Sequence, residues 1–70
     1  MTTYKVRAYT GPAIVEQIAD KLRSHGFEVS TGTETVYFYS EGDSKDNAAD
    51  NAERDVRRIY PHAGFRVFPV

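Results

Sequence analysis

The chain contains no cysteine among its 70 residues, which excludes disulfide bonds, thiolate zinc sites and a cysteine nucleophile. Its only histidines are His25 and His62, which argues against a conventional metal site, and we expect no cofactor. A chain of this length forms one domain, residues 1–70, and buries only about 60% of its unfolded surface. Such a core rarely supplies more than about 3–5 kcal/mol. We therefore expect the domain to gain stability by association through an exposed face.

An excess of charge of either sign is also absent, since nine basic side chains stand against ten acidic ones. No global electrostatic attraction to nucleic acid or to a membrane surface follows from this balance. Long apolar runs are missing as well: no window approaches the roughly 20 apolar residues of a membrane span. The first residues, Met1-Thr2-Thr3, lead directly into Tyr4 without the apolar core of a signal peptide. We therefore expect a cytoplasmic protein that makes no membrane contact.

The most informative segment is residues 35–40, which predicts a strand with apolar side chains on both faces. Side chains alternate across a strand with period two, so Val36 and Phe38 share one face. Tyr37 and Tyr39 share the other. A sheet covered by helices on one side needs only one such pair for its core. The two tyrosines are therefore candidates for a contact surface.

Periodicity and turn residues predict the order strand, helix, strand, strand, helix, strand. We expect strands at residues 4–9, from Phe27 to a hairpin loop at 31–33, at 35–40 and at 65–70. The first helix should start near Pro12, whose missing N–H has no partner in a first turn, and end at Gly26 as a left-handed cap. The second helix should run from a cap at Asp43 or Ser44 to about Tyr60.

This order resembles the ferredoxin-like, or split βαβ, fold over the whole chain, although the resemblance is topological and involves no signature residues. It implies an α+β sandwich: a four-stranded antiparallel sheet in the order 4-1-3-2 with both helices on one face. The first helix should contribute Ile14, Ile18 and Leu22 to the core, and the second should approach the sheet through small alanines. The expected contribution of the sheet is Val6, Ala8, Phe27, Val29, Val36, Phe38, Phe65 and Val67.

The uncovered face of that sheet should collect aromatic and basic side chains. The candidate binding residues are Lys5, Arg7, Tyr9, Tyr37, Tyr39, Arg66 and Phe68. Aromatic residues and arginine are enriched at protein interfaces, so the pattern predicts a small non-enzymatic binding protein that forms a homodimer or docks a protein partner. The alternative without a partner is a half-exposed scaffold, in which cross-strand aromatic pairs contribute roughly 0.2–1 kcal/mol each.

Single-stranded nucleic acid is a second candidate partner. RNA recognition motifs share this topology and stack bases on sheet aromatics. Tyr37 and Tyr39 resemble the two-residue spacing of aromatics on that family's third strand. The basic residue and glycine expected just before them are replaced by Glu34, Thr35 and Val36. The binding residues of that family are therefore not carried over to this chain.

Catalytic motifs are not recognisable in the sequence, and we predict no enzymatic activity. Small acylphosphatases resemble this topology, but the loop that should contain their arginine is Thr10-Gly11-Pro12-Ala13 here. Metal-carrying ferredoxin-like domains would need a Cys-x-x-Cys pair. His62 is the one plausible acid–base group, and we expect a solvated loop histidine. A third alternative is a small subunit of an enzyme whose chemistry belongs to another chain.

A possible secondary basic patch follows from the arginines late in the second helix. Its members are Arg54, Arg57, Arg58 and His62. Such a group would suit a phosphate or an acidic protein surface. It is also typical of a solvated helix face, since the pairs Asp50–Arg54 and Glu53–Arg57 are each four residues apart. A lone domain without catalytic motifs also fits a small accessory factor of a phage or mobile element.

Overall fold

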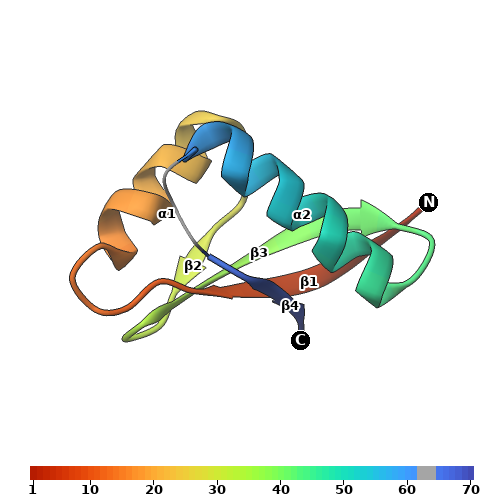
Figure 1. The fold of residues 1–70 in the computed structure, drawn as a ribbon, viewed down its shortest axis with the longest axis horizontal. Helices are drawn as coiled ribbons and strands as arrows, with labels where there is room; N and C mark the ends of the chain where they lie inside the picture. The colour runs from red at the N-terminus through yellow and green to blue at the C-terminus, as the bar shows by residue number, and fades with distance from the viewer. Residues whose placement is uncertain (62–64) are drawn as a thin grey trace.

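The computed structural model describes residues 1–61 and 65–70. Figure 1 shows the elements β1 (Thr2–Tyr9), α1 (Val15–Ser24), β2 (Ser30–Thr31), β3 (Thr35–Gly42), α2 (Lys45–Ile59) and β4 (Val67–Pro69). The strands form one sheet in the order β2-β3-β1-β4, with every neighbouring pair antiparallel. Both helices lie on the same side of this sheet (Figure 1). The predicted ferredoxin-like arrangement, with the sheet order 4-1-3-2, is confirmed.

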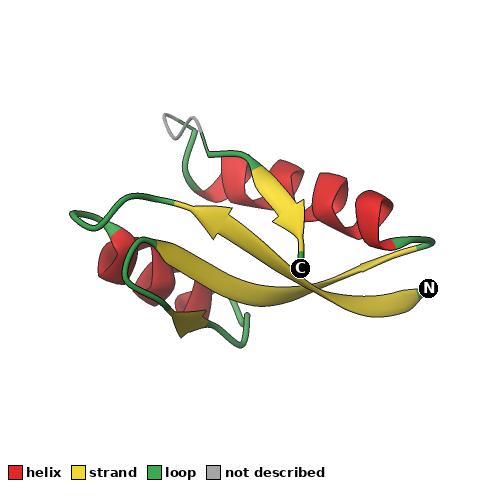
Figure 2. Cartoon of the chain, turned by 90° about the horizontal axis from the view of Figure 1, so that it is seen from below, coloured by secondary structure: helices red, strands yellow, loops and turns green. Residues whose placement is uncertain are grey.

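The centre of the sheet is a long ribbon of β1 and β3, and the outer strands are short. The ribbon has eight residue pairs, from Thr2 opposite Gly42 to Tyr9 opposite Thr35. By contrast, β4 pairs with three residues of β1, and β2 with only two residues of β3. Figure 2 shows the short outer strands beside the two long central ones. The two long strands thus make up most of the sheet. One of their faces is turned to the helices and the other is turned away from them.

The core lies between the helices and the covered face of the sheet. From the sheet it contains Val6, Ala8, Val36, Phe38 and Val67. From the helices it contains Val15, Ile18, Ala19, Leu22, Ala48, Ala49, Ala52 and Val56. Val36 and Phe38 are fully buried, which confirms the predicted inward face of β3. Small alanines on α2 leave room for this helix close to the sheet, because their side chains add little depth between the two layers.

The predicted start of the first helix at Pro12 is wrong by three residues. Helix α1 begins at Val15, and its N-cap residue Ile14 makes no side-chain capping bond. The backbone N–H groups of Thr10 and Gly11 both donate to the Glu34 carbonyl, at 2.8 and 3.1 Å, and Gly11 has a φ of 80°. The chain is thereby held against the loop before β3 and needs the following residues to turn toward the helix.

The end of α1 confirms Gly26 as a left-handed cap, with a φ of 92°. The Gly26 N–H donates to the Arg23 carbonyl, and the Phe27 N–H donates to the Leu22 carbonyl. These two bonds make up a Schellman motif, in which the residue after the cap commonly packs on the last helical turn. Phe27 belongs to the same apolar cluster as Leu22 and meets the Phe38 ring edge to face, with centroids 5.6 Å apart.

Two predicted strands are shorter than expected. Phe27 and Val29 lie outside β2 as half-buried side chains packed on the core, because the Schellman motif directs the chain inward before pairing can begin. Similarly, β4 begins at Val67, and Phe65 packs half-buried against the core outside the strand. In the register of β4, Phe65 would need Thr10 as its partner, and β1 has ended at that point.

The N-terminus of α2 is capped by Ser44, one of the two predicted cap residues. Its hydroxyl oxygen accepts a hydrogen bond from the Asn47 N–H at 3.1 Å. In return, the Asn47 side-chain oxygen accepts from the Asp43 N–H at 3.0 Å. The two bonds satisfy backbone donors at a position where the helix itself offers no acceptor.

Replacing this cap should weaken the domain measurably. We expect Ser44→Ala to lower the free energy of unfolding by about 1 kcal/mol, because the Asn47 N–H loses its acceptor. Urea denaturation followed by circular dichroism measures the change. Ser44→Asp is the matched control, since its carboxylate restores an acceptor and should keep stability close to wild type. Equal losses in both variants would show that the capping bond is not what stabilises this end.

Candidate functional site

The face of the sheet that carries no helix is the candidate site, and we call it the open sheet face (Figure 1). The strand register sets one row of residues across all four strands: Ser30, Tyr37, Arg7 and Phe68. A second row pairs Lys5 with Tyr39, and a third pairs Tyr9 with Thr35. The open sheet face therefore brings together six of the seven candidate binding residues from the sequence: Lys5, Arg7, Tyr9, Tyr37, Tyr39 and Phe68.

Three aromatic side chains on this face are well exposed. The exposed fractions are 57% for Tyr9, 48% for Tyr39 and 44% for Phe68. Tyr37 is half-buried between its neighbours in the central row. Single exposed apolar side chains are ordinary in a monomer, whereas several grouped on one face are typical of an interaction site.

Arg66 does not join the other six residues. It lies before the first residue of β4, so strand alternation does not determine where its side chain points. Its Nε lies 3.8 Å from Oε1 of Glu53 on α2, the helix that covers the opposite face. The same Glu53 oxygen accepts the Val67 N–H at 3.0 Å. The guanidinium is thus turned to the helix side of the β4 edge, which corrects the expected position.

The centre of the open sheet face is basic. The Lys5 ammonium lies 5.3 Å from the centroid of the Tyr37 ring, within the range of a cation–π contact. Within residues 1–61 and 65–70, neither Lys5 nor Arg7 forms an ion pair with a carboxylate. Two cations therefore stand among the aromatic side chains without a negative partner in the described chain.

Tyr9 is fixed at one end of the face by the loop before β3. Its hydroxyl donates to Oε2 of Glu34 at 3.0 Å. This hydrogen bond, together with the negative charge of Glu34 and slight desolvation, raises the pKa of Tyr9 above its usual value. The hydrogen bond holds the Tyr9 ring at this end of the face, where it is exposed to solvent.

A hollow of about 310 Å³ lies beside this ring, lined by Arg7, Tyr9, Thr35 and Phe68. Its volume is at the lower end of the range of about 300–1,000 Å³ for ligand pockets, which suits one side chain of a partner. Two aromatic rings supply apolar walls, and the Arg7 guanidinium supplies a cation. Thr35 shares the face of Tyr37 and Tyr39 by alternation along the predicted strand, but it was not selected because it is neither aromatic nor basic. Ser30 could not be placed from the sequence, because its position depends on how β2 pairs with β3.

The predicted secondary basic patch on α2 is largely neutralised within the helix. Arg57 pairs with Glu53 at 3.5 Å, as predicted, and Arg58 pairs with Asp55 at 2.7 Å. The predicted pair of Asp50 with Arg54 is not among the ion pairs of the part of the chain that the structure describes. His62 lies outside the described residues. Arg54, Arg57 and Arg58 are therefore part of a solvated face of α2.

Two features were searched for in the described segments: a cluster of metal-ligating side chains and a helix able to cross a membrane. Among residues 1–61 and 65–70, no three acidic or histidine side chains lie close enough together to hold a metal ion. In the same ranges, no helix combines the length and apolar character needed to cross a membrane. His25 is the exposed C-cap residue of α1.

No known protein was found to be similar to this chain. No family model matches the chain, and searches among curated proteins and solved structures likewise found no match. The open sheet face is therefore the main feature of this ferredoxin-like domain that points to a function.

Proposed function

We propose that this protein is a non-enzymatic docking protein that binds a protein partner through the open sheet face. The observation that carries the proposal is the exposure of Tyr9, Tyr39 and Phe68, between 44% and 57%, on a sheet face that no helix covers. Aromatic side chains dominate the energetics of interface centres, and grouped exposed apolar surface is typical of interaction sites. An accessory role in the cytoplasm belongs to the same proposal and depends on the sequence pattern.

The chemistry of the face favours a partner with an apolar side chain next to a carboxylate. The apolar group would enter the hollow of about 310 Å³ between Tyr9 and Phe68. The carboxylate would then pair with the Arg7 guanidinium, whose planar fork matches a carboxylate with two hydrogen bonds. Such a contact would also supply the negative partner that Arg7 does not find in the described part of its own chain.

A second copy of the chain fits this face less well than a different protein. A two-fold dimer presents the same surface patch from both subunits. Face-to-face packing would bring the central Lys5 and Arg7 of one copy toward those of the other, and like charges across an interface oppose association. The charge pattern therefore favours an acidic partner over homodimerisation.

Single-stranded nucleic acid is also less favoured by the geometry. Base recognition on a sheet of this topology requires a free aromatic ring face for stacking. The Lys5 ammonium lies 5.3 Å from the centroid of Tyr37 and covers that ring. The central aromatic of the row is thereby engaged in a contact that a stacked base would have to displace.

Substitutions on the open sheet face should weaken partner binding while the fold persists. For a partner isolated with the wild-type protein, we expect Tyr39→Ala or Phe68→Ala to weaken binding by about 30-fold, or about 2 kcal/mol. Arg7→Glu should weaken it further by repelling the partner's carboxylate. Titration calorimetry measures binding, and thermal melts check that the variants stay folded. Arg54→Glu is the matched control, because it reverses one exposed arginine on α2.

Sedimentation of the protein alone separates the remaining candidates. The proposal predicts a monomer at all concentrations, because the open sheet face binds a different protein and not a second copy. A dimer abolished by Tyr39→Ala would instead assign the face to a second copy. Submicromolar binding of mixed single-stranded RNA or DNA, lost in Tyr37→Ala, would assign it to nucleic acid. A partner that binds wild type and Phe68→Ala equally would rule out the open sheet face.

A further inference from the structure

A free strand edge lies at the far end of β3, away from its pairing with β2. Ser30 is opposite Tyr37 and Thr31 is opposite Val36, and the β2 ladder contains only these two pairs. Strand β3 continues to Gly42, so its last residues are paired with β1 on one side only. The next rungs on the β2 side would fall at Tyr39 and Glu41.

The hydrogen-bond pattern identifies which backbone groups point to this edge. The Thr10 N–H donates to the Glu34 carbonyl across the β1–β3 ladder, and the Gly32 N–H donates to the Thr35 carbonyl across the β2–β3 ladder. The direction of backbone hydrogen bonding alternates along an antiparallel strand. The backbone N–H and C=O groups of odd-numbered β3 residues therefore point toward β2, and those of even-numbered residues point toward β1. The N–H and C=O of Tyr39 therefore point to the open edge. The Glu41 carbonyl is satisfied there by the Asn51 side chain, at 3.0 Å.

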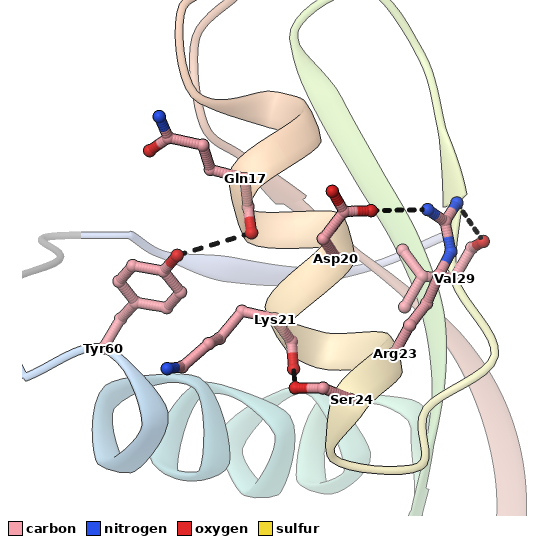
Figure 3. A network of polar contacts seen from close by, with 7 residues as sticks. All are labelled: Gln17, Asp20, Lys21, Arg23, Ser24, Val29 and Tyr60. Atoms are coloured by element: carbon pink, nitrogen blue, oxygen red, sulfur yellow. Dashed lines mark hydrogen bonds and ion pairs between the residues drawn. The ribbon is translucent and has the colours of Figure 1, made fainter.

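The segment that could have filled this edge is held away from it. The Schellman motif directs Phe27 into the core, where its ring contacts the Phe38 ring. Arg23 donates to the Val29 carbonyl at 3.0 Å and pairs with Asp20 at 3.2 Å, and Figure 3 shows this bridge from α1 to the strand connection. The backbone of residues 26–29 thus hydrogen-bonds to α1, and in the described chain it is not part of the ladder with β3.

The separation leaves a groove, which we call the β3-edge groove. Its volume is about 660 Å³, and it is lined by Thr3, Gly26, Phe27, Glu28, Tyr39, Ser40, Glu41, Asn51 and Asp55. No lysine or arginine is among these lining residues, whereas Glu28, Glu41 and Asp55 are acidic. Asp55 pairs with Arg58, but within residues 1–61 and 65–70 neither glutamate forms an ion pair. The groove is therefore negatively charged.

We propose that the β3-edge groove binds an extended basic peptide segment of another protein by strand addition to β3. Unpaired strand edges are templates for an additional strand, whose backbone hydrogen bonds give affinity and whose side chains give specificity. The segment would pair with the N–H and C=O of Tyr39 and place lysine or arginine side chains near Glu28 and Glu41. A second copy would present the same acidic groove, and like charges oppose association, so the occupant is a segment of a different protein. Tyr39 belongs to both sites: its side chain lies on the open sheet face, whereas its backbone N–H and C=O point to this groove. The proposal rests on the strand edge and the acidic lining, and not on what binds the open sheet face.

A synthetic hexapeptide of alternating lysine and valine, blocked at both ends, is the probe. We expect it to bind the full chain and to slow amide hydrogen exchange at Tyr39, measured by nuclear magnetic resonance. The double variant Glu28→Lys with Glu41→Lys should bind the peptide about tenfold more weakly. Glu16→Lys with Asp50→Lys is the matched control: it makes the same change in net charge on the two helices and should bind as wild type does.

Two further peptides distinguish strand addition from simple charge attraction. A hexapeptide with glutamate in place of lysine should not bind, because the groove is acidic. Methylation of alternate backbone nitrogens on the lysine peptide should abolish binding, since the N–H donors for Tyr39 are removed. Unchanged exchange at Tyr39, equal binding of the methylated peptide, or equal weakening by both double variants would overturn the proposal.

Discussion

Phe38→Ala is expected to unfold a large part of the population at room temperature. Phe38 is fully buried, and its ring meets Phe27 edge to face at 5.6 Å. Truncation loses this burial and leaves a cavity, which costs about 3–5 kcal/mol for a core phenylalanine. A 70-residue domain at about 0.05–0.15 kcal/mol per residue has a total stability of only about 3.5–10 kcal/mol. Urea denaturation and thermal melts followed by circular dichroism measure the loss.

Tyr39→Ala provides the control on the same strand. Tyr39 is 48% exposed on the open sheet face, so its truncation removes few core contacts and should change stability by much less. Comparable losses in the two variants, or an unchanged melting temperature for Phe38→Ala, would show that the two faces of β3 are assigned wrongly.

Gly42→Ala is expected to destabilise the domain by about 1–3 kcal/mol through overpacking. Gly42 is buried at the end of β3, where the first turn of α2 crosses close to the strand. A Cβ at this position would lie 2.5 Å from the backbone nitrogen of Ala48 and 2.8 Å from its Cα. These are backbone atoms, so the helix itself would have to move. For a domain of this size each kcal/mol lowers the melting temperature by roughly 4–8 °C.

Gly32→Ala is the matched control, because the same substitution there meets only ordinary contacts. Its Cβ would lie 3.5 Å from a Tyr37 ring carbon and 3.6 Å from the Thr35 carbonyl. We expect this variant to melt close to wild type. If Gly42→Ala had the same melting temperature as Gly32→Ala, α2 would not approach the end of β3 as closely as the structure shows.

Local patterns in the sequence were sufficient to predict the order of the elements and the two faces of β3. Alternation along a strand is a property of the backbone, so Phe38 could be assigned to the core and Tyr39 to the opposite face before any partner strand was known. Gly26 could be predicted as a helix end for a similar reason, because glycine adopts positive φ without steric cost. The element order then limited the topology, since crossover connections are right-handed.

Where each outer strand begins was decided only by tertiary contacts. Phe27 has strand-like neighbours in the sequence, but the Schellman bonds and the contact with Phe38 draw it into the core. Arg66 was expected on the open sheet face because it alternates with Val67. Instead it precedes the first residue of β4, and its guanidinium lies near Glu53 on α2, which is 13 residues earlier in the chain.

The candidate sites divide in the same way. The sequence by itself determined that aromatic and basic side chains share the open sheet face, because that follows from strand period and element order. The tertiary structure decided three other features. It set the row in which Arg7 lies between Tyr37 and Phe68, the free strand edge at Tyr39, and the close approach of α2 to Gly42. The physical reason is that register and interlayer distance are set by contacts between residues far apart in the chain, which no local pattern of residues encodes.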